Sequence, residues 1–215
     1  MINERQLPMT LDQTSFLEGI AYLVKTDTDL AKIIHDLGPP PLWPRDPGFA
    51  TLIYVILEQQ VSLASAAAAF SKLQVVAGQL KPKRFLELTD EELKTIGFSR
   101  QKTRYVRELA QAIVNREIDL DGLHRLDDAA ARHVLMSLKG IGSWTADIYL
   151  LRALLRPDIW PAKDLALAKA VRVVKDLPSK PSLEMLQEIA RPWKPWRAVA
   201  ARILWHYYLH NGSTG

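Results

Sequence analysis

Apolar residues recur at helical spacing along almost the whole chain, and this pattern limits the fold more than any other feature of the sequence. Within residues 15–25, for example, Phe16, Ile20 and Leu23 fall on one stripe. The alternation of period two that marks half-buried strands is nearly absent. We therefore predict an all-α fold with short helices and short loops. The predicted helices span residues 15–25, 27–37, 49–59, 62–77, 83–88, 90–96, 101–115, 128–138, 143–155, 164–175, 182–190 and 195–210.

A proline-rich segment interrupts the helical pattern after the first two predicted helices. Residues 38–44 read Gly-Pro-Pro-Pro-Leu-Trp-Pro, which ends a helix and stiffens the connection that follows. A chain of 215 residues is long enough to bury a full core. Its length suits one compact domain or two lobes, and the break favours two lobes.

Composition excludes several kinds of chemistry. The chain has no cysteine, so it has no disulfide, cysteine nucleophile, thiolate zinc site or cysteine-ligated iron–sulfur cluster. Its 28 Lys and Arg against 24 Asp and Glu give a net charge of +4, which permits a nucleic acid partner without requiring one. No signal-peptide pattern and no membrane-length apolar run is present. We expect an intracellular protein, in the cytoplasm or nucleoid, or in the nucleus of a eukaryote.

The most informative motif is Leu138-Lys139-Gly140-Ile141-Gly142-Ser143-Trp144-Thr145, between two predicted helices. Two glycines around one apolar residue allow a tight turn and a close approach of the backbone to a ligand. The amides around this turn and the following helix start favour an anion such as a phosphate. A plain helical corner that uses glycine for tightness is the alternative, since the motif is short.

In its context, this motif resembles the helix–hairpin–helix element of the base-excision DNA glycosylase superfamily. Residues 160–169, Trp-Pro-Ala-Lys-Asp-Leu-Ala-Leu-Ala-Lys, look like the family's Pro-x-x-Asp loop. Residues 57–62, Leu-Glu-Gln-Gln-Val-Ser, are similar to its glutamine-rich turn, and residues 193–205 are similar to the 3-methyladenine DNA glycosylase II branch. The resemblance implies a two-lobed helical enzyme with a DNA-binding cleft between its lobes. It covers most of residues 49–205.

The resemblance assigns the catalytic carboxylate to Asp164. Breaking an N-glycosidic bond builds positive charge on the sugar, and a nearby carboxylate can stabilise that charge or orient a water. Asp164 also precedes an apolar helix, so an N-cap role is the alternative. Both roles are compatible, because a carboxylate at a helix start is stabilised in its charged form.

The resemblance also assigns the pocket that receives the flipped base. Trp144 and Trp205 match aromatic pocket positions, where an electron-rich ring stacks on a cationic base, and Ile148 with Tyr149 stands where some relatives carry a pocket tyrosine. Burial in the core is the alternative for both tryptophans. Bifunctional relatives carry a Schiff-base lysine at the position of Trp144, so this chain is expected to lack lyase activity.

Contacts with double-stranded DNA that contains damaged bases are expected from the hairpin and the glutamine turn, in which Gln60 stands at the family's wedge position. The expected contact residues are Gln59, Gln60, Ser62, Lys139, Gly140, Ile141, Gly142, Ser143 and Thr145. In relatives, backbone carbonyls of the hairpin hold a monovalent cation, Na⁺ or K⁺. These carbonyls correspond to Met136, Leu138 and Ile141.

We therefore expect a monomeric, monofunctional glycosylase that removes alkylated purines of the 3-methyladenine and 7-methylguanine type and so initiates base excision repair. Residues 1–45 and 176–215 are expected to form one lobe. Residues 46–175 are expected to form the other, with the hairpin at about 134–155 and the catalytic loop at 160–165. The alternatives are a glycosylase for hypoxanthine, ethenoadenine or uracil, and a non-catalytic helix–hairpin–helix DNA-binding module.

Overall fold

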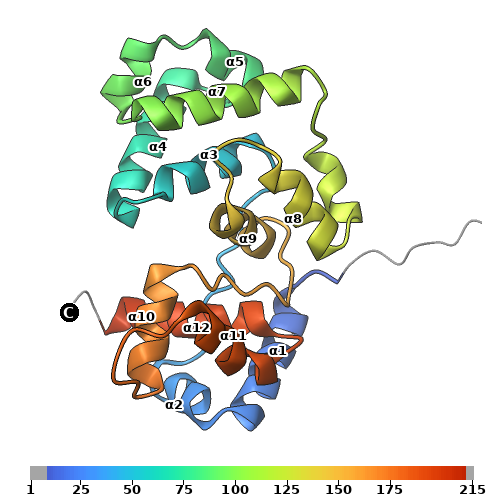
Figure 1. Ribbon diagram of the computed structural model, residues 1–215, viewed down its shortest axis with the longest axis vertical. Coiled ribbons are helices and arrows are strands. Elements are labelled where there is room, and N and C mark those ends of the chain that lie inside the picture. Colours follow the sequence, from blue (N-terminus) through green and yellow to red (C-terminus); the bar gives the residue numbers. More distant parts are fainter. Residues whose placement is uncertain (1–8, 212–215) are drawn as a thin grey trace, which may run out of the picture. The chain divides into compact units, whose positions relative to one another are not determined.

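The computed structural model describes residues 9–211, and Figure 1 shows that this part of the chain is helical throughout. Within the described residues there are twelve α-helices, two short 3-10 helices and no strand, which confirms the prediction of an all-α fold. The elements are α1 (Gln13–Thr26), α2 (Thr28–Leu37), α3 (Phe49–Glu58), α4 (Leu63–Ala77), α5 (Pro82–Glu87), α6 (Asp90–Ile96), α7 (Arg100–Val114), η1 (Asp121–Arg125), α8 (Asp128–Met136), α9 (Ser143–Arg152), α10 (Leu165–Val174), α11 (Leu183–Ala190), η2 (Arg191–Trp193) and α12 (Arg197–His210).

Helix ends differ from the predicted ones by a few residues. The largest difference is at α9, which was expected to reach residue 155 and ends at Arg152. Leu155 has a φ of +52°, outside the helical region, and Pro157 disfavours helical backbone in the residue before it. The apolar residues that follow α9 therefore continue its hydrophobic pattern without continuing the helix.

The described chain divides into two compact units. Unit 1 is Arg45–Leu154, and unit 2 combines Met9–Pro44 with the described part of Leu155–Gly215. Residues 1–8 and 212–215, which were expected in the terminal lobe, lie outside the described residues. The proline-rich segment ends the first part of unit 2, where the sequence suggested a connection.

The predicted boundary of the second lobe is wrong. Residues 155–175 were expected with the hairpin, but they belong to unit 2 with the two ends of the chain. The reason is packing: α10 buries its apolar side, including Leu167 and Val171, and lies against α12. The loop at residues 160–165, which contains Asp164, is therefore built into unit 2.

Helix α3 forms the centre of unit 1. Nine of its ten residues are buried, and it packs against α4, α7 and α9, while α5 lies on α7 and α8 lies on α9 (Figure 1). Its last residue, Glu58, accepts from Nη1 of Arg152 at 2.9 and 3.1 Å. This largely buried ion pair joins the end of α3 to the end of α9 and anchors the turn that begins at Gln59.

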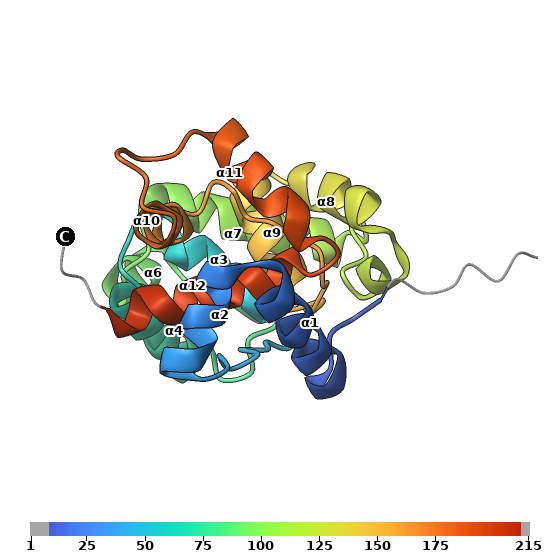
Figure 2. The ribbon, with the colours of Figure 1, turned by 90° about the horizontal axis from the view of Figure 1, so that it is seen from below.

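Helix α12 forms the centre of unit 2. The eight residues of Ala198–Trp205 are all buried, and α12 packs against α1, α2 and α10, an arrangement that can be followed in Figure 2. Gly19 allows α1 to come close, because a Cβ at this position would lie 2.8 Å from the ring of Trp196. Because α12 also packs against α10, its position sets which of its side chains lie beside the start of α10.

A charged cluster joins three elements of unit 2. Asp27 accepts from Nζ of Lys175 at 2.7 Å and from Nε1 of Trp193 at 2.8 Å, and Lys175 also donates to Asp29 at 2.7 Å. Burial acts to raise the pKa of Asp27, but these hydrogen bonds outweigh it and the pKa is lowered from 3.8. Burial acts to lower the pKa of Lys175, but its carboxylate partners outweigh it and the pKa is raised from 10.5.

Replacing Lys175 with methionine is expected to lower the free energy of unfolding at pH 7 by about 2 kcal/mol, since a charged hydrogen bond is lost. Because the pKa of Asp27 is lowered in the folded state, the contribution of the pair is present above pH 4 and is lost as the pH falls through the lowered value. Chemical denaturation at pH 7 and pH 3 should show the difference between Lys175→Met and wild type shrinking at the lower pH. An equal difference at both values, or an equal loss in the exposed control Lys180→Met, would contradict this assignment.

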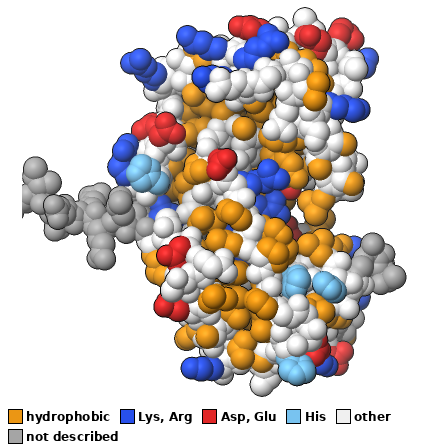
Figure 3. Space-filling view, turned by 180° about the vertical axis from the view of Figure 1, so that it is seen from behind, with side chains coloured by type: hydrophobic (Ala, Val, Ile, Leu, Met, Phe, Trp, Pro, Cys, Tyr) orange, Lys and Arg blue, Asp and Glu red, His pale blue; other side chains and the backbone are white. Residues whose placement is uncertain are grey.

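The surface has no single basic face on the side drawn in Figure 3, where Lys and Arg side chains are spread among Asp and Glu. Charge alone therefore does not mark a binding surface on this side. None of the helices between residues 9 and 211 is long and apolar enough to cross a membrane.

Candidate active site

The glycine motif forms a tight turn between α8 and α9 in unit 1. Gly140 has a φ of +86°, a conformation that favours glycine, and Ile141 N donates to Leu138 O at 3.1 Å to close the turn. Ile141 is 4% exposed, so its side chain packs into the core beneath the turn. Gly142 is the N-cap of α9 and offers no capping side chain. The first amides of α9 are therefore left without a side-chain cap, an arrangement that suits an anion.

Gln59 ties the glutamine turn to this hairpin. Its Nε2 donates to Gly140 O and to Thr145 Oγ1, each at 2.9 Å. Thr145 is 2% exposed and its hydroxyl accepts from Gln59, so its side chain holds the turn in place, while its contact with DNA stays a prediction. The next residue, Gln60, is exposed and has a φ of +59°, a strained conformation of the kind found at ligand clamps.

A cavity of about 740 Å³ opens beside the hairpin and the glutamine turn, all within unit 1. Its walls come from the turn after α3, from the first two turns of α7 and from the hairpin. The lining residues are Gln59, Gln60, Val61, Ser99, Gln101, Lys102, Tyr105, Met136, Leu138, Lys139, Gly140, Ile141 and Gly142. Six of the nine predicted DNA contacts therefore meet at one recess: Gln59, Gln60, Lys139, Gly140, Ile141 and Gly142.

Helix α7 supplies one wall of the cavity, and one residue of this wall, Tyr105, was not predicted. Tyr105 packs on the hairpin so closely that a Cβ on Gly140 would lie 2.2 Å from Cγ of its ring. Lys102 lines the same cavity and donates to Leu57 O at 2.8 Å, and burial lowers the pKa of its amine. A second glycine turn before α7 points to this region in the sequence, but no local signal identifies Tyr105.

Three of the predicted contacts, Ser62, Lys139 and Ser143, differ in their exposure and in their partners. Ser62 is exposed and is the N-cap of α4, where its Oγ accepts from Ser65 N at 3.2 Å. Lys139 is exposed and lies 3.5 Å from Glu108, a distance that leaves a weak surface pair. The hydroxyl of Ser143, at the start of α9, is buried and has no hydrogen-bond partner in the structure.

Asp164 lies at the start of α10 in unit 2. Its Oδ1 accepts from Leu167 N at 2.8 Å, so the N-cap role considered for this residue is present. The same oxygen accepts from Nε1 of Trp205 at 3.1 Å. Trp205 is 7% exposed and Asp164 is only partly buried, so a core side chain holds a carboxylate that solvent reaches. This hydrogen bond has no counterpart in the sequence reasoning, which gave Trp205 only a stacking role.

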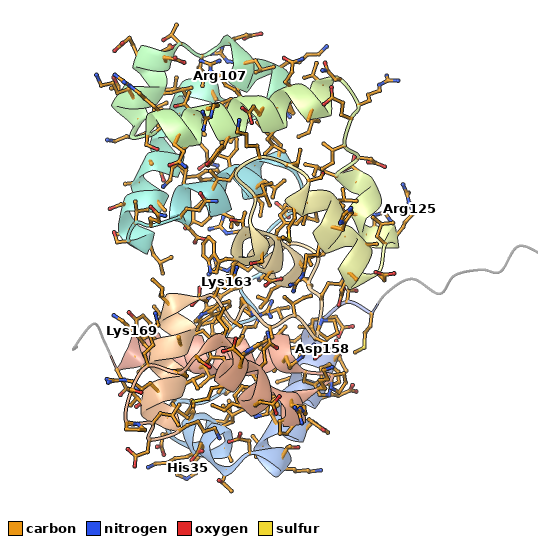
Figure 4. The ribbon with its side chains drawn as sticks, viewed as in Figure 1. His35, Arg107, Arg125, Asp158, Lys163 and Lys169 are labelled. Atoms are coloured by element: carbon orange, nitrogen blue, oxygen red, sulfur yellow. The ribbon has the colours of Figure 1, made fainter. Side chains whose placement is uncertain are left out.

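The loop before Asp164 is also fixed to α12. Asp158 accepts from Nε and Nη2 of Arg197 at 2.8 and 2.9 Å, a paired geometry that holds both groups in one orientation. Ala198 N donates to Pro157 O at 2.9 Å. Figure 4 labels Asp158 and also Lys163, which is exposed in the loop that leads into α10. Both ends of this loop are thus positioned by α12.

The predicted pocket residues of α9 are not equally accessible. Trp144, in the first turn, is partly exposed. Ile148 is 1% exposed and Tyr149 is fully buried, with its hydroxyl accepting from Gly48 N at 2.8 Å. Burial raises the pKa of Tyr149 to about 12. These contacts favour a core role for Tyr149, while the pocket role of Trp144 stays a prediction.

Side-chain metal sites are absent from the described part of the chain, where no three His, Cys, Asp or Glu residues cluster. The carbonyl groups considered for a monovalent cation belong to Met136, Leu138 and Ile141, which all line the cavity at the hairpin. Backbone carbonyls are hard oxygen ligands, a donor type that suits Na⁺ or K⁺, and the cation itself stays a prediction.

Comparison with known proteins places this geometry in a family. Residues 53–195 match the family described as HhH-GPD superfamily base excision DNA repair protein. The chain is 27% identical over 191 residues to the alkylbase DNA glycosidase-like protein mag2 of Schizosaccharomyces pombe, covering 86% of this chain and 90% of that protein. It is 27% identical over 169 residues to a DNA-3-methyladenine glycosylase of Bacillus subtilis, covering 73% of this chain but 56% of that protein.

A solved structure shares the fold. The S. pombe 3-methyladenine DNA glycosylase Mag1, in complex with abasic DNA, matches with a TM-score of 0.76 and 25% identity. The match covers 87% of this chain and 95% of that one. Because the family match spans more than half of the chain, this protein belongs to the HhH-GPD superfamily of base excision DNA repair proteins.

Proposed function

We propose that this protein is a monofunctional DNA glycosylase that hydrolyses the N-glycosidic bond of alkylated purines, of the 3-methyladenine and 7-methylguanine type. The observation that carries the proposal is the carboxylate of Asp164, held by an amide and an indole N–H at the start of α10. The names of the relatives from S. pombe and B. subtilis, an alkylbase glycosidase-like protein and a 3-methyladenine glycosylase, support the substrate class.

Unit 1 would grip the DNA backbone. The amides at the start of α9 bind a phosphate, and Gly142 permits close approach because nothing lies within 4 Å of where its Cβ would be. Such contacts position the duplex without reading its sequence. Exposed Gln60, held by the hydrogen bonds of Gln59 to the hairpin, fills the space of the flipped nucleotide.

Unit 2 would supply the chemistry. The bond between the sugar C1′ and the purine nitrogen breaks with its electron pair leaving on the base, and positive charge develops on the sugar. An alkylated purine already carries positive charge, so it leaves as a neutral base. The Asp164 carboxylate stabilises the sugar cation, and a water adds to C1′ and loses its proton. The products are a free base and an abasic site.

Lyase activity is not expected from this chain. A lyase step of the Schiff-base type needs an amine nucleophile, and an indole at Trp144 cannot form that bond. With no cysteine there is also no cysteine-ligated iron–sulfur cluster. Trp144 and Trp205 instead offer rings on which a cationic base stacks.

A monovalent cation at the carbonyls of Met136, Leu138 and Ile141 is part of the proposal. It would supply positive charge beside the phosphate that the hairpin binds. Thallium, a scattering substitute for potassium, should appear at these three carbonyls in crystals. If thallium at saturating concentration does not bind at the hairpin, the monovalent cation is not part of the function.

Purified protein incubated with duplex DNA methylated at N3 and N7 of purines is expected to release free methylpurines, because the leaving group is already charged. The product strand should break only after alkali, and borohydride should trap no covalent adduct. Liquid chromatography of the freed bases and a gel of the strands measure both. Duplexes that contain uracil, hypoxanthine or ethenoadenine run in parallel.

Each contrary result supports a different alternative. Release from a parallel duplex but not from methylated DNA would make the protein a glycosylase for that other lesion. Binding to all duplexes without release from any would make it a non-catalytic DNA-binding module. A trapped adduct would contradict the monofunctional mechanism.

A further inference from the structure

We propose that Trp205 is a positioning residue for the Asp164 carboxylate, acting through its indole N–H in addition to its ring. This inference rests on the proposed function, since it gives Trp205 a part in the same reaction. Trp205 Nε1 and Leu167 N both donate to Asp164 Oδ1, at 3.1 and 2.8 Å. The two donors come from different helices, α12 and α10.

Two hydrogen-bond donors restrain the Asp164 carboxylate more tightly than one. The Leu167 amide holds Oδ1 near the start of α10, but a carboxylate with one donor can still rotate about the bond that carries it. The Trp205 N–H, which comes from α12, binds the same oxygen as the Leu167 amide, so residues of two helices restrain Oδ1. Trp205 is itself held by burial, and α12 is joined to the loop before Asp164 by the Asp158–Arg197 pair. Stabilisation of a charge on the sugar depends steeply on that placement.

Unit 2 contains a second N-cap carboxylate that accepts from an amide and an indole, with a different use. Asp27 is the N-cap of α2, where its Oδ1 accepts from Leu30 N at 3.2 Å, while Trp193 Nε1 donates to its other oxygen, Oδ2, at 2.8 Å. There Lys175 also binds the carboxylate, and the cluster joins three elements of the core. The same chemical pair thus occurs once as a structural link and once at the candidate active site, so Trp193 offers a matched control.

The test uses single-turnover release of methylpurines with enzyme in excess over DNA. Trp205→Phe should lower the release rate about tenfold to a hundredfold, because the donor to Asp164 is lost, while the Kd for lesion DNA changes less than about threefold. A 3-benzothienylalanine at position 205 keeps the bicyclic ring and replaces N–H by sulfur, and it should lower the rate to a similar extent. In an Asp164→Asn background, Trp205→Phe should cause no further loss.

Several results would overturn the proposal while leaving the proposed function intact. One is that the wild type is active and the variant with 3-benzothienylalanine at position 205 releases bases at the wild-type rate. Another is a loss from Trp205→Phe that adds fully to that of Asp164→Asn, or appears only in Kd, as stacking alone predicts. Trp193→Phe should lower the melting temperature without changing the release rate. If that control does not fold, Trp43→Phe serves, since Trp43 lies in the proline-rich segment of unit 2, outside the loop at residues 160–165. An inactive wild type would instead contradict the proposed function.

Discussion

Replacing Asp164 with asparagine is expected to slow the release of methylpurines by at least about a hundredfold, with the fold and DNA binding kept. Asparagine is a good N-cap, and its side-chain oxygen can still accept from the Leu167 amide and the Trp205 indole. It carries no negative charge, so the positive charge that develops on the sugar loses its stabilising partner. The substitution therefore changes charge while it leaves geometry nearly constant.

Free-base release and fluorescence anisotropy with the same methylated duplex measure the two properties separately. The matched control is Asp12→Asn, at the N-cap of α1 in the same unit, where Asp12 accepts from Ser15 N at 2.7 Å. This control should release bases at the wild-type rate. Unchanged release by Asp164→Asn would remove Asp164 from the mechanism. Loss of DNA binding together with release would indicate a binding role instead.

Replacing each of the two hairpin glycines with alanine is expected to change a different property, stability at Gly140 and DNA affinity at Gly142. At Gly140 the φ of +86° and the ring of Tyr105, 2.2 Å from the added Cβ, should lower the free energy of unfolding by about 2–3 kcal/mol. At Gly142 the φ is −87° and nothing lies within 4 Å, so stability should change by less than about 0.5 kcal/mol. The new methyl group at Gly142 would stand where a phosphate must approach the amides of α9, and the Kd should rise about tenfold or more.

Denaturation curves and anisotropy with undamaged duplex DNA distinguish the two variants. Gly142→Ala with normal affinity would show that the backbone of the hairpin does not meet the DNA. Gly140→Ala with normal stability would show that Tyr105 yields easily and does not hold the turn. The contrast between the variants is informative because both carry the same chemical change two residues apart.

Local signals made most of the helices predictable. Thr89 and Glu92 have the sequence spacing of a capping box, and both of its reciprocal hydrogen bonds are formed at the start of α6. The glycine motif and the N-cap position of Asp164 are also patterns of consecutive residues, so both could be predicted from the sequence. Fold class and hairpin follow from such short-range patterns.

Features that join distant segments could not be predicted in the same way. The Trp205–Asp164 hydrogen bond spans 41 residues, and Gln59 reaches Gly140 across 81. The lobe boundary failed for this reason, since the packing of α10 on α12 depends on the register of two helices that no local pattern relates. Tyr105 was not predicted because its role depends on its contact with Gly140, and no pattern in the neighbouring sequence indicates that contact.

Unit 2 is assembled from both ends of the chain, and this has a consequence for synthesis on the ribosome. The described part of unit 1 is contiguous, and the bond from Arg45 N to Arg152 O joins its ends, so this part can fold once residue 154 has emerged. Helices α1 and α2 emerge first, yet α12, which packs against both of them, emerges last. A chain that stops before α12 would keep the hairpin and Asp164 but would display an uncovered apolar surface, and it should therefore be cleared by proteolysis or aggregate.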